Sequence, residues 1–576
     1  MASSHSLLRL LEADLRALSE VRDAKKYPEV KESSERALLK LRSIAKSLPA
    51  NASAAEQANA VAGTDDMLVP FMHAIAQKSD ALPLSALGAV QRMISHNAVA
   101  PQRLPTVTTQ LIARAQQPSA DEPSLLKVLQ TVLTIASSPA LLHSDTTVSQ
   151  LLLLCLTLQQ NRSNTIKNTA SATVQQFVAL LLDAVAAEKA STFDKPPPPP
   201  PQPDVKLSPP TKDQLSSLSV AARCAFMAVQ DLCLLANGEP ALWLPGSGPL
   251  SIPFAFEVIN RTLASHVPLF IHFEPFRFLL RERCTALVLK TAQQPERQEW
   301  AVALRLSHLT STLLISYADM LRTESAILLS MLTKTASSES ISIPQRVLAL
   351  EACRVVTAHP KLLRSLFEKH DKRPGTSAVF TTFTSAISAL LKSKTLNPSS
   401  SRADQIEAHF LTTHRAAASS RGATFNAALY SEVDGTALTS DHAAALAVEC
   451  QVCIAGAIGV IGEPLRPTTD EGEITKASPT KDGGGGDGGS GAAAAVDRLR
   501  SGGDADAGGG EKSEILIVRE MVGACWKALL GALSLLMASF GREEGVQVRE
   551  ARTPYTHTHS IVHPHLTPFS PSHRPS

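Results

Sequence analysis

Hydrophobic side chains recur every three to four positions through residues 1–190. In the first stretch the apolar stripe is Leu7, Leu8, Leu11, Leu15 and Leu18. An α-helix turns once in about 3.6 residues, so this spacing collects apolar side chains on one helix face. Similar stripes predict further helices near residues 38–48, 68–75, 84–94, 107–112, 125–135, 148–158 and 166–182.

Prolines separate these stripes and predict short links between the helices. Proline lacks the backbone N–H that a helix interior needs, so it marks helix boundaries. Short links without alternating strand patterns indicate antiparallel helices stacked in sequence. We therefore expect an all-α fold, an armadillo- or HEAT-like helical solenoid with disordered linkers and C-terminal tail. The separating prolines are Pro28, Pro49, Pro83, Pro101, Pro105, Pro118, Pro123 and Pro139.

A second helical block follows at residues 213–395, after a proline-rich break. The same periodicity then returns at 443–461 and at 514–540, where the last helix is expected to stand almost alone. Within the second block the predicted helices are 215–236, 254–266, 276–291, 301–321, 326–332, 344–359, 361–369 and 379–391.

Shifts in composition divide the chain into segments. Glycine and aspartate at the density of KDGGGGDGGSGAAAA cannot bury a core, so this part is predicted to be a flexible linker. The pattern stops abruptly near the C-terminus, which suggests a truncated gene model. The expected segments are a helical domain at 1–190, a Pro-rich linker at 191–212, a helical domain at 213–395, a further helical segment at 396–465, a Gly-rich disordered linker at 466–512, an isolated helix at 513–541 and a disordered tail at 542–576.

The break STFDKPPPPPPQPDVKLSPPTK contains six consecutive prolines at 196–201. Such a run favours an extended polyproline II conformation. A spacer between the two helical domains is the favoured interpretation. A ligand role for an SH3- or WW-type domain is the alternative.

Composition supports helix-on-helix packing and gives no sign of nucleic-acid binding. Apolar residues make up 44% of the chain but aromatic residues only 4%, so the core is built from aliphatic side chains. A β-sandwich favours aromatic and β-branched residues instead. The 55 basic and 53 acidic residues leave a net charge of +2, which is not the electrostatic pattern of a DNA- or RNA-binding protein.

No secretory signal or membrane-spanning segment is expected. The N-terminal pattern carries Arg9, Glu12, Asp14 and Arg16, so it is amphipathic and not a signal sequence. The longest apolar runs fall short of the roughly 20 residues that cross a bilayer. We expect a protein that is cytosolic or bound to a membrane from outside.

Cysteines are scattered and favour a reducing compartment. CQVC, with Cys450 and Cys453, has the spacing of a redox or zinc motif, but no second cysteine or histidine pair lies near it. Both thiols lie in the apolar stretch ALAVECQVCIAGAIGVI, so we interpret them as core residues of one helix.

No constellation of residues predicts catalysis, a cofactor or a metal. The phosphate-binding GxxxxGK[ST] and nucleophile GxSxG motifs are absent from the sequence. His96 and His143 fall at helix ends, and Glu12 and Glu35 have no defensible partner carboxylate. The five histidines between His557 and His573 are interpreted as part of a disordered end, with metal binding as the weaker alternative.

The stretch QQNRSNTIKNTASATVQQFVALLLDAV begins with polar residues and continues as an apolar stripe. Ser163 or Asn164 is expected to cap a helix, because a short polar side chain accepts from free N–H groups in the first turn. The stripe that follows is Ile166, Ala170, Val174, Phe177 and Leu181. We interpret the stretch as a capped core helix.

Six segments in order resemble the N-terminal part of the monensin-sensitivity (Mon-two) protein family, which is related to the large Sec-seven-type Arf exchange factors. The chain is far shorter than full-length members of that family. The segments are LLRLLEADLRALSEVRDAKKYPEVKESSERALLKLRS, ALGAVQRMISHNAVA, LLKVLQTVL, LLLLCLTLQQNRSNTIKNTASATVQQFVALLLD, DLCLLANGEPALWL and EPFRFLLRERCTALVLK.

This resemblance implies a dimerisation and cyclophilin-binding (DCB) domain at 1–190 and a homology-upstream-of-Sec-seven (HUS) domain at 213–395. It implies a scaffold that is not an enzyme. Such a scaffold is peripheral on Golgi and endosome membranes and acts in traffic between the trans-Golgi network, endosomes and vacuole. The implied partners are a Dopey-type protein, a phospholipid flippase and a small Arf-like GTPase, together with a second copy of the chain.

One departure separates the chain from the exchange factors. Where they carry an Asn-Tyr-Asp-Cys-like box, this sequence reads SLFEKHDKRPG and keeps only Asp371. Two alternatives stay open: the regulatory N-terminal region of an Arf exchange factor, or an unrelated helical-repeat transport adaptor.

Overall fold

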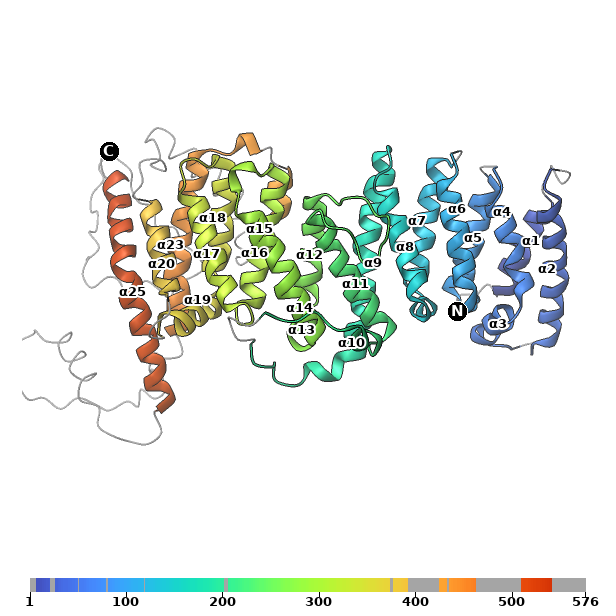
Figure 1. The fold of residues 1–576 in the computed structure, drawn as a ribbon, viewed down its shortest axis with the longest axis horizontal. Coiled ribbons are helices and arrows are strands. Elements are labelled where there is room, and N and C mark those ends of the chain that lie inside the picture. The colour runs from blue at the N-terminus through green and yellow to red at the C-terminus, as the bar shows by residue number, and fades with distance from the viewer. Residues whose placement is uncertain are drawn as a thin grey trace, which may run out of the picture. The chain divides into compact units, whose positions relative to one another are not determined.

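The described part of the chain is helical throughout, with no strand in it. The expected all-α helical solenoid is confirmed. In Figure 1 the helices of residues 1–328 follow one another along the chain. The computed structural model describes residues 7–20, 26–49, 51–78, 81–118, 120–200, 206–372, 377–391, 424–432, 435–462 and 509–540.

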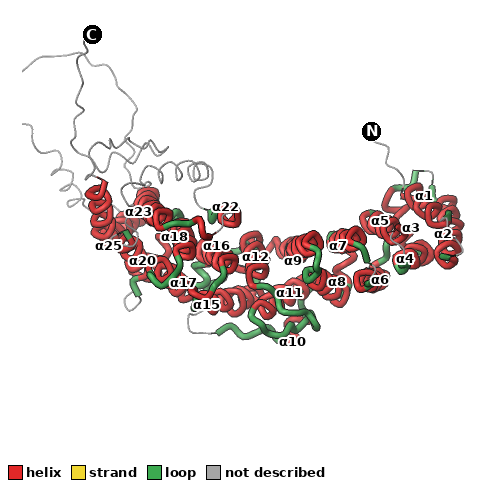
Figure 2. The backbone as a smooth tube through the Cα atoms, turned by 90° about the horizontal axis from the view of Figure 1, so that it is seen from above, coloured by secondary structure: helices red, strands yellow, loops and turns green. Residues whose placement is uncertain are grey.

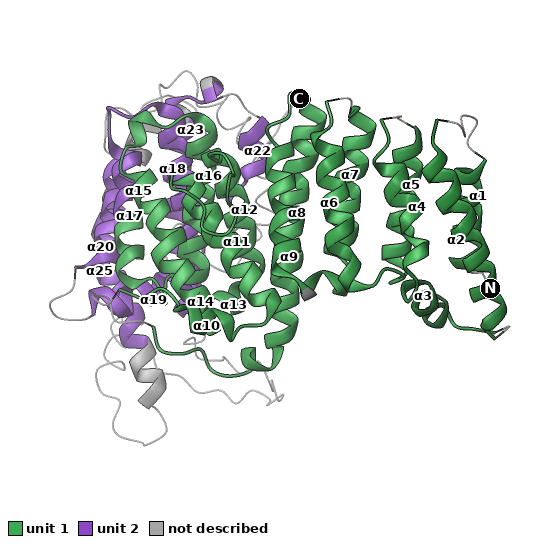
Figure 3. Cartoon of the chain, turned by 45° about the vertical axis from the view of Figure 1, so that its right-hand side comes forward, with its two compact units in different colours: residues 1–328 green, residues 329–576 purple. Residues whose placement is uncertain are grey.

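The chain forms two compact units, residues 1–328 and 329–576, coloured separately in Figure 3. The boundary lies inside α17 (Arg322–Ser337). Unit 1 otherwise contains α1 (Leu7–Ser19), α2 (Pro28–Ser47), α3 (Ala54–Ala62), α4 (Val69–Ile75), α5 (Ala81–Ser95), α6 (Leu104–Gln116), α7 (Glu122–Ala136), α8 (Asp145–Leu158), α9 (Asn164–Phe193), α10 (Lys212–Ser216), α11 (Val220–Ala236), α12 (Ile252–Ser265), α13 (Val267–His272), α14 (Glu274–Phe278), α15 (Ala286–Ala292) and α16 (Trp300–Tyr317).

Unit 1 is built as two layers of helices, which Figure 2 shows from above. One layer contains α5, α7, α9, α12 and α16, and the other contains α4, α6, α8 and α11. Neighbouring helices of each layer pack against each other, and the two layers pack together, as α8 and α11 do against α9. The apolar stripes of the sequence meet between the layers, and Phe177 and Leu111 are fully buried there.

Prolines and short polar residues set the starts of the helices. Pro28, Pro105 and Pro123 occupy the first turns of α2, α6 and α7, where the missing N–H has no helical partner to lose. Pro83 likewise lies in the first turn of α5 and is buried. The separators seen in the sequence are therefore helix starts more often than links.

Three helices differ from the prediction. The nine-residue α3 lacks a long apolar stripe and was not predicted, although the capping box of Ser53 and Glu56 marks its start. Helix α9 continues to Phe193, into the predicted linker. The helix predicted at 215–236 is two helices, because Ser219 accepts from the backbone N–H of Ala222 and caps α11 separately.

Two predicted helices contain a wider π-helical turn. The helix predicted at 276–291 passes through the π segment η4 (Leu279–Thr285), and the one at 361–369 ends in η6 (Phe367–Asp371). A π turn moves the hydrogen bond to the fifth residue, a change that hydrophobic periodicity does not reveal.

A buried carboxylate holds the loop after α11. Asp231, fully buried, accepts backbone N–H groups from Leu242, Trp243 and Leu244 at 2.7–2.9 Å. Gly238 reverses the chain at the end of α11 with φ of 78°, a conformation that suits glycine. These contacts explain why DLCLLANGEPALWL folds as one piece.

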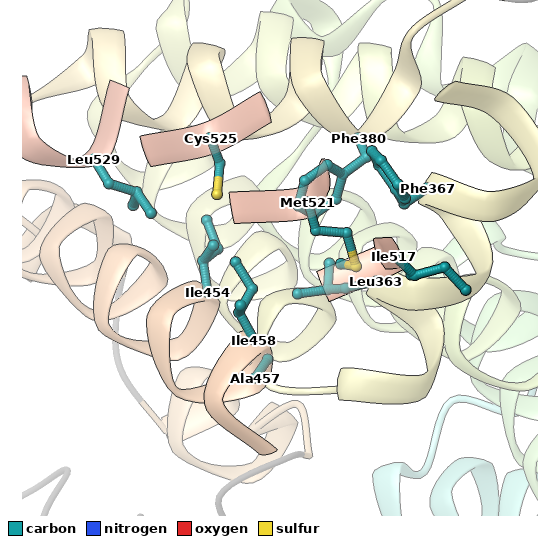
Figure 4. Close-up of a cluster of buried hydrophobic side chains, with 10 residues drawn as sticks. All are labelled: Leu363, Phe367, Phe380, Ile454, Ala457, Ile458, Ile517, Met521, Cys525 and Leu529. Carbon is teal, nitrogen blue, oxygen red and sulfur yellow. The ribbon is translucent and has the colours of Figure 1, made fainter. Parts of the chain in front are cut away.

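Unit 2 contains the helices after the boundary, and its largest contact is between α18 and α23. It also contains a buried apolar cluster that includes residues of α25, shown in Figure 4. The described helices are α18 (Ile343–Thr357), α19 (Pro360–Leu366), α20 (Val379–Leu390), α22 (Ala427–Glu432), α23 (Ser440–Gly462) and α25 (Gly509–Phe540).

The expectation that the last helix stands almost alone is wrong. Helix α25 packs against α20 and α23. Ile517, Met521, Cys525 and Leu529 lie in the same cluster as Ile454 of α23 (Figure 4). The long glycine-rich segment before α25 suggested isolation, but chain distance does not limit which helices pack together.

Two helices are long and apolar enough, by length and composition alone, to cross a bilayer: Asn164–Phe193 and His442–Gly462. The expectation that every apolar segment is too short is therefore wrong. Within each unit, however, these helices pack against neighbours: α9 against α7, α8 and α11, and α23 against α18, α20 and α25. Core helices of this kind pass the same test of composition.

Candidate functional site

A polar cavity of about 200 Å³ opens between α9 and α12 of unit 1. Both helices belong to the same layer of unit 1 (Figure 2). The cavity has few apolar side chains, unlike the core on either side of it. Its lining residues are Gln175, Gln176, Ala179, Asp183, Val258, Arg261, Thr262, Ser265 and His266.

His266 joins the two sides of this cavity. Its Nε2 lies 3.0 Å from Oδ1 of Asp183, and its Nδ1 lies 3.2 Å from the carbonyl oxygen of Thr262. The His266 side chain is 5% exposed, whereas that of Asp183 is 66% exposed. Both partners are acceptors, so each hydrogen bond needs a proton on the ring nitrogen that makes it.

This geometry suits recognition better than acid–base catalysis. Both ring nitrogens of His266 are engaged by Asp183 and Thr262, so the ring is not placed to activate a hydroxyl. Arg261 donates from Nη1 to Oε1 of Gln175 at 3.3 Å across the same gap.

A second polar cluster lies in unit 2, between α18 and α23. Arg354 donates from Nε and Nη2 to both carboxylate oxygens of the fully buried Glu351, each at 2.8 Å. It lies 3.7 Å from Glu449 of α23 and donates to the carbonyl oxygen of Thr424 at 3.3 Å. Two carboxylates therefore share one guanidinium.

Burial and charge set the protonation of this cluster. Burial raises the pKa of the Glu449 carboxyl to about 7, and repulsion from Glu351 adds to the rise while Arg354 opposes it. Burial opposes the charge of Arg354, but its hydrogen bonds to Glu351 raise the pKa of the guanidinium overall. A group that titrates near neutral pH is therefore part of the helix packing.

The two cysteines of CQVC follow the core interpretation in part. Cys450 is fully buried, with its Sγ 3.7 Å from the carbonyl oxygen of Leu350, and burial raises its pKa well above the usual value. Cys453 is half-buried, and burial raises its pKa as well. Among the described residues no group of three or more histidines, cysteines and carboxylates could hold a metal ion.

Asp371, the residue kept from the exchange-factor box, anchors the start of α20. Its Oδ1 accepts from the backbone N–H of Phe380, and its Oδ2 accepts from the N–H and hydroxyl of Thr381, at 2.7–2.9 Å. The carboxylate thus satisfies free donors in the first turn of the helix, across a loop of the chain.

The other residues singled out in the sequence have structural roles. Ser163 caps α9 by accepting from the N–H of Ile166, and the five-residue stripe that follows is buried. Glu12 pairs with Arg16, and Glu35 pairs with Lys31. His96 is exposed after the end of α5. The side chain of His143 and the tail histidines lie outside the described residues.

Sequence reasoning missed both polar clusters. A usable signal existed for one: Glu351 interrupts the apolar run LALEACRVV and has Arg354 three residues later, which is the spacing of a helical ion pair. No comparable signal marks Asp183 and His266, because Asp183 lies on α9, His266 lies between α12 and α13, and they meet only through packing.

Two family models match this chain. Residues 2–189 match the DCB, or dimerisation and cyclophilin-binding, domain of Mon2/Sec7/BIG1-like proteins. Residues 221–379 match the HUS domain of the same group.

Several curated proteins with similar sequences carry the name MON2. Protein MON2 homolog of Homo sapiens is 28% identical over 410 residues, and that of Xenopus laevis is 28% identical over 411. Each match covers 68% of this chain and 23% of the relative. Protein MON2 of Saccharomyces cerevisiae is 23% identical over 325 residues, which cover 55% of this chain and 19% of that protein. The chain spans about a quarter of the length of the curated relatives it matches.

Proposed function

The chain belongs to the Mon2/Sec7/BIG1-like family, and from this premise we propose a peripheral membrane scaffold in vesicle-mediated protein traffic. It would act by binding other proteins between the trans-Golgi network, endosomes and vacuole, on the cytoplasmic side of Golgi and endosome membranes. The observation that carries the proposal is the succession of DCB and HUS matches, together with relatives named MON2.

The proposed domains are DCB at 1–190 and HUS at 213–395, separated by the proline-rich segment at 191–212. The compact units divide elsewhere, inside α17. In a solenoid each helix contacts mainly its neighbours. The boundary between compact units therefore need not coincide with the boundary between family domains.

A scaffold fits the chemistry of the described residues. The charged groups in both polar clusters are paired with one another within the helix packing, as structural groups are. Two layers of helices present long surfaces that can dock helices or GTPases. The proposed partners are a Dopey-type protein, a phospholipid flippase and a small Arf-like GTPase, with no nucleic acid among them.

Affinity purification tests this function most directly. The tagged chain is expressed in cells, and its partners are identified from isolated Golgi and endosome membranes. An unrelated helical-repeat protein of similar size with the same tag is the control. Enrichment of a Dopey-type protein over that control is expected. A chain found only in the soluble fraction, without a membrane-associated partner, would contradict the proposal.

Self-association is a separate part of the proposal, since the DCB domain takes its name from dimerisation. Sedimentation equilibrium of the purified chain over a range of concentrations should give a dimer mass. A mass of 61.2 kDa at all concentrations is that of the monomer and would contradict the proposed self-association.

A further inference from the structure

The proline-rich segment between α9 and α10 is held at its first end. Helix α9 ends at Phe193, whose ring lies 6.0 Å from that of His272 on α13. One turn earlier, the Nζ of Lys189 lies 5.0 Å from the ring centroid of Phe273. The chain therefore leaves α9 from a position fixed against α13.

Its second end is held as well. The backbone N–H of Leu207 donates to Oε1 of Glu282 in η4 at 3.0 Å. Thr211 and Gln214 then form a capping box that starts α10. Figure 2 shows α10 and the loops beside it outside the two layers of helices, next to α11.

The two domains do not need this segment as a spacer. Helices α9 and α11 pack directly against each other. The N-cap Ser219 of α11 donates to Glu188 of α9, and Arg223 makes two hydrogen bonds to Asp145 of α8. Because the two domains are in direct contact, no gap between them has to be spanned by a rigid proline run. The expected spacer role therefore does not explain the prolines.

Three prolines of the run are exposed to solvent. Pro196, Pro197 and Pro199 are exposed, whereas Pro198 and Pro200 are half-buried. Polyproline II repeats every three residues, so Pro196 and Pro199 share one edge. Lys195, also exposed, stands at the start of that edge.

We propose that Lys195–Pro200 is a docking segment for an SH3-type domain. Such domains bind Pro-x-x-Pro ridges in aromatic-lined grooves, and a proline run that favours polyproline II loses little conformational entropy on binding. Lys195 would pair with acidic residues beside the groove. Contacts of Phe193 before the segment and of Leu207 after it hold its two ends against unit 1. This inference does not rest on the proposed trafficking function.

Titration of the whole purified chain into isotopically labelled SH3 domains tests the proposal. The probes are several SH3 domains with acidic residues beside the groove. Shifts confined to the groove are expected for at least one of them. The double variant Pro196→Ala with Pro199→Ala should weaken binding about tenfold or more, and Lys195→Glu should weaken it and reverse its dependence on salt.

The matched control changes prolines of the same segment outside the ridge, Pro209→Ala with Pro210→Ala, and should leave the affinity unchanged. Circular dichroism confirms that each variant keeps its helices. The proposal is overturned if no probe binds, if the ridge and control variants weaken binding equally, or if a WW domain or profilin binds the ridge while the SH3 domains do not.

Discussion

Four carboxylates, two buried and two half-buried, make much of the specific polar contact of this chain. Asp231 and Asp371 accept backbone N–H groups, whereas Glu351 and Glu449 share the guanidinium of Arg354. The first two satisfy the ends of helices and loops. The last two place like charges close together, which costs free energy when both are ionised.

Glu449 makes the stability of unit 2 depend on pH. Its folded pKa, about 7, lies above its ordinary value of 4.5, so the folded state binds the proton more tightly. The stabilisation that comes from this tighter proton binding is fully present below about pH 4.5 and is lost as the pH rises through 7. Glu449→Gln should therefore leave stability unchanged near pH 4.5 and raise it at pH 8 by about 2–3 kcal/mol.

Urea unfolding at a series of pH values measures this effect. The exposed Glu432→Gln is the matched control, and its stability should follow the wild-type curve. Parallel pH profiles for Glu449→Gln and the wild type would show that the carboxylate does not titrate as the packing implies.

Asp231 should be sensitive even to an isosteric change. In Asp231→Asn one oxygen becomes an NH₂ group that faces backbone N–H donors. A loss of about 2–4 kcal/mol in the unfolding free energy of unit 1 is expected. Asp213→Asn, at an exposed position of α10, should change it by less than about 0.5 kcal/mol. Equal effects would mean that the three hydrogen bonds contribute nothing.

At the scale of elements, hydrophobic period predicted most helices and their buried faces. The prediction from hydrophobic spacing failed where a helix start or a turn type is set by something else. The short α3 depends on a capping box, and η4 and η6 depend on a shifted hydrogen-bond pattern. The single predicted helix at 215–236 became two because Ser219 caps the second.

Helix α25 allows a direct test of its packing. Met521 is fully buried in the cluster of Figure 4, whereas Leu516 on the same helix is 50% exposed. Met521→Asp should cost about 3–5 kcal/mol, because it removes apolar contacts and buries a charge, and α25 should become sensitive to proteolysis. Leu516→Asp should leave the cleavage pattern unchanged. The same pattern for both variants would contradict the packing of α25.

At the scale of the whole molecule, two compact units predict unfolding in more than one step. Urea unfolding followed by circular dichroism should show two transitions. Asp231→Asn should shift the one that belongs to unit 1, and Met521→Asp the one that belongs to unit 2. A single transition, shifted by either substitution, would show that the chain unfolds as one cooperative body.

The sequence by itself determined the helical class, most of the buried stripes and, through ordered segments of resemblance, the family. Those properties follow from local periodicity and from residue order, which are readable along one chain. Tertiary structure decided that α25 joins a shared core, that His266 meets Asp183, and that Glu449 shares Arg354 with Glu351. These contacts join residues on different elements, and packing alone brings such groups within hydrogen-bonding distance or removes them from water.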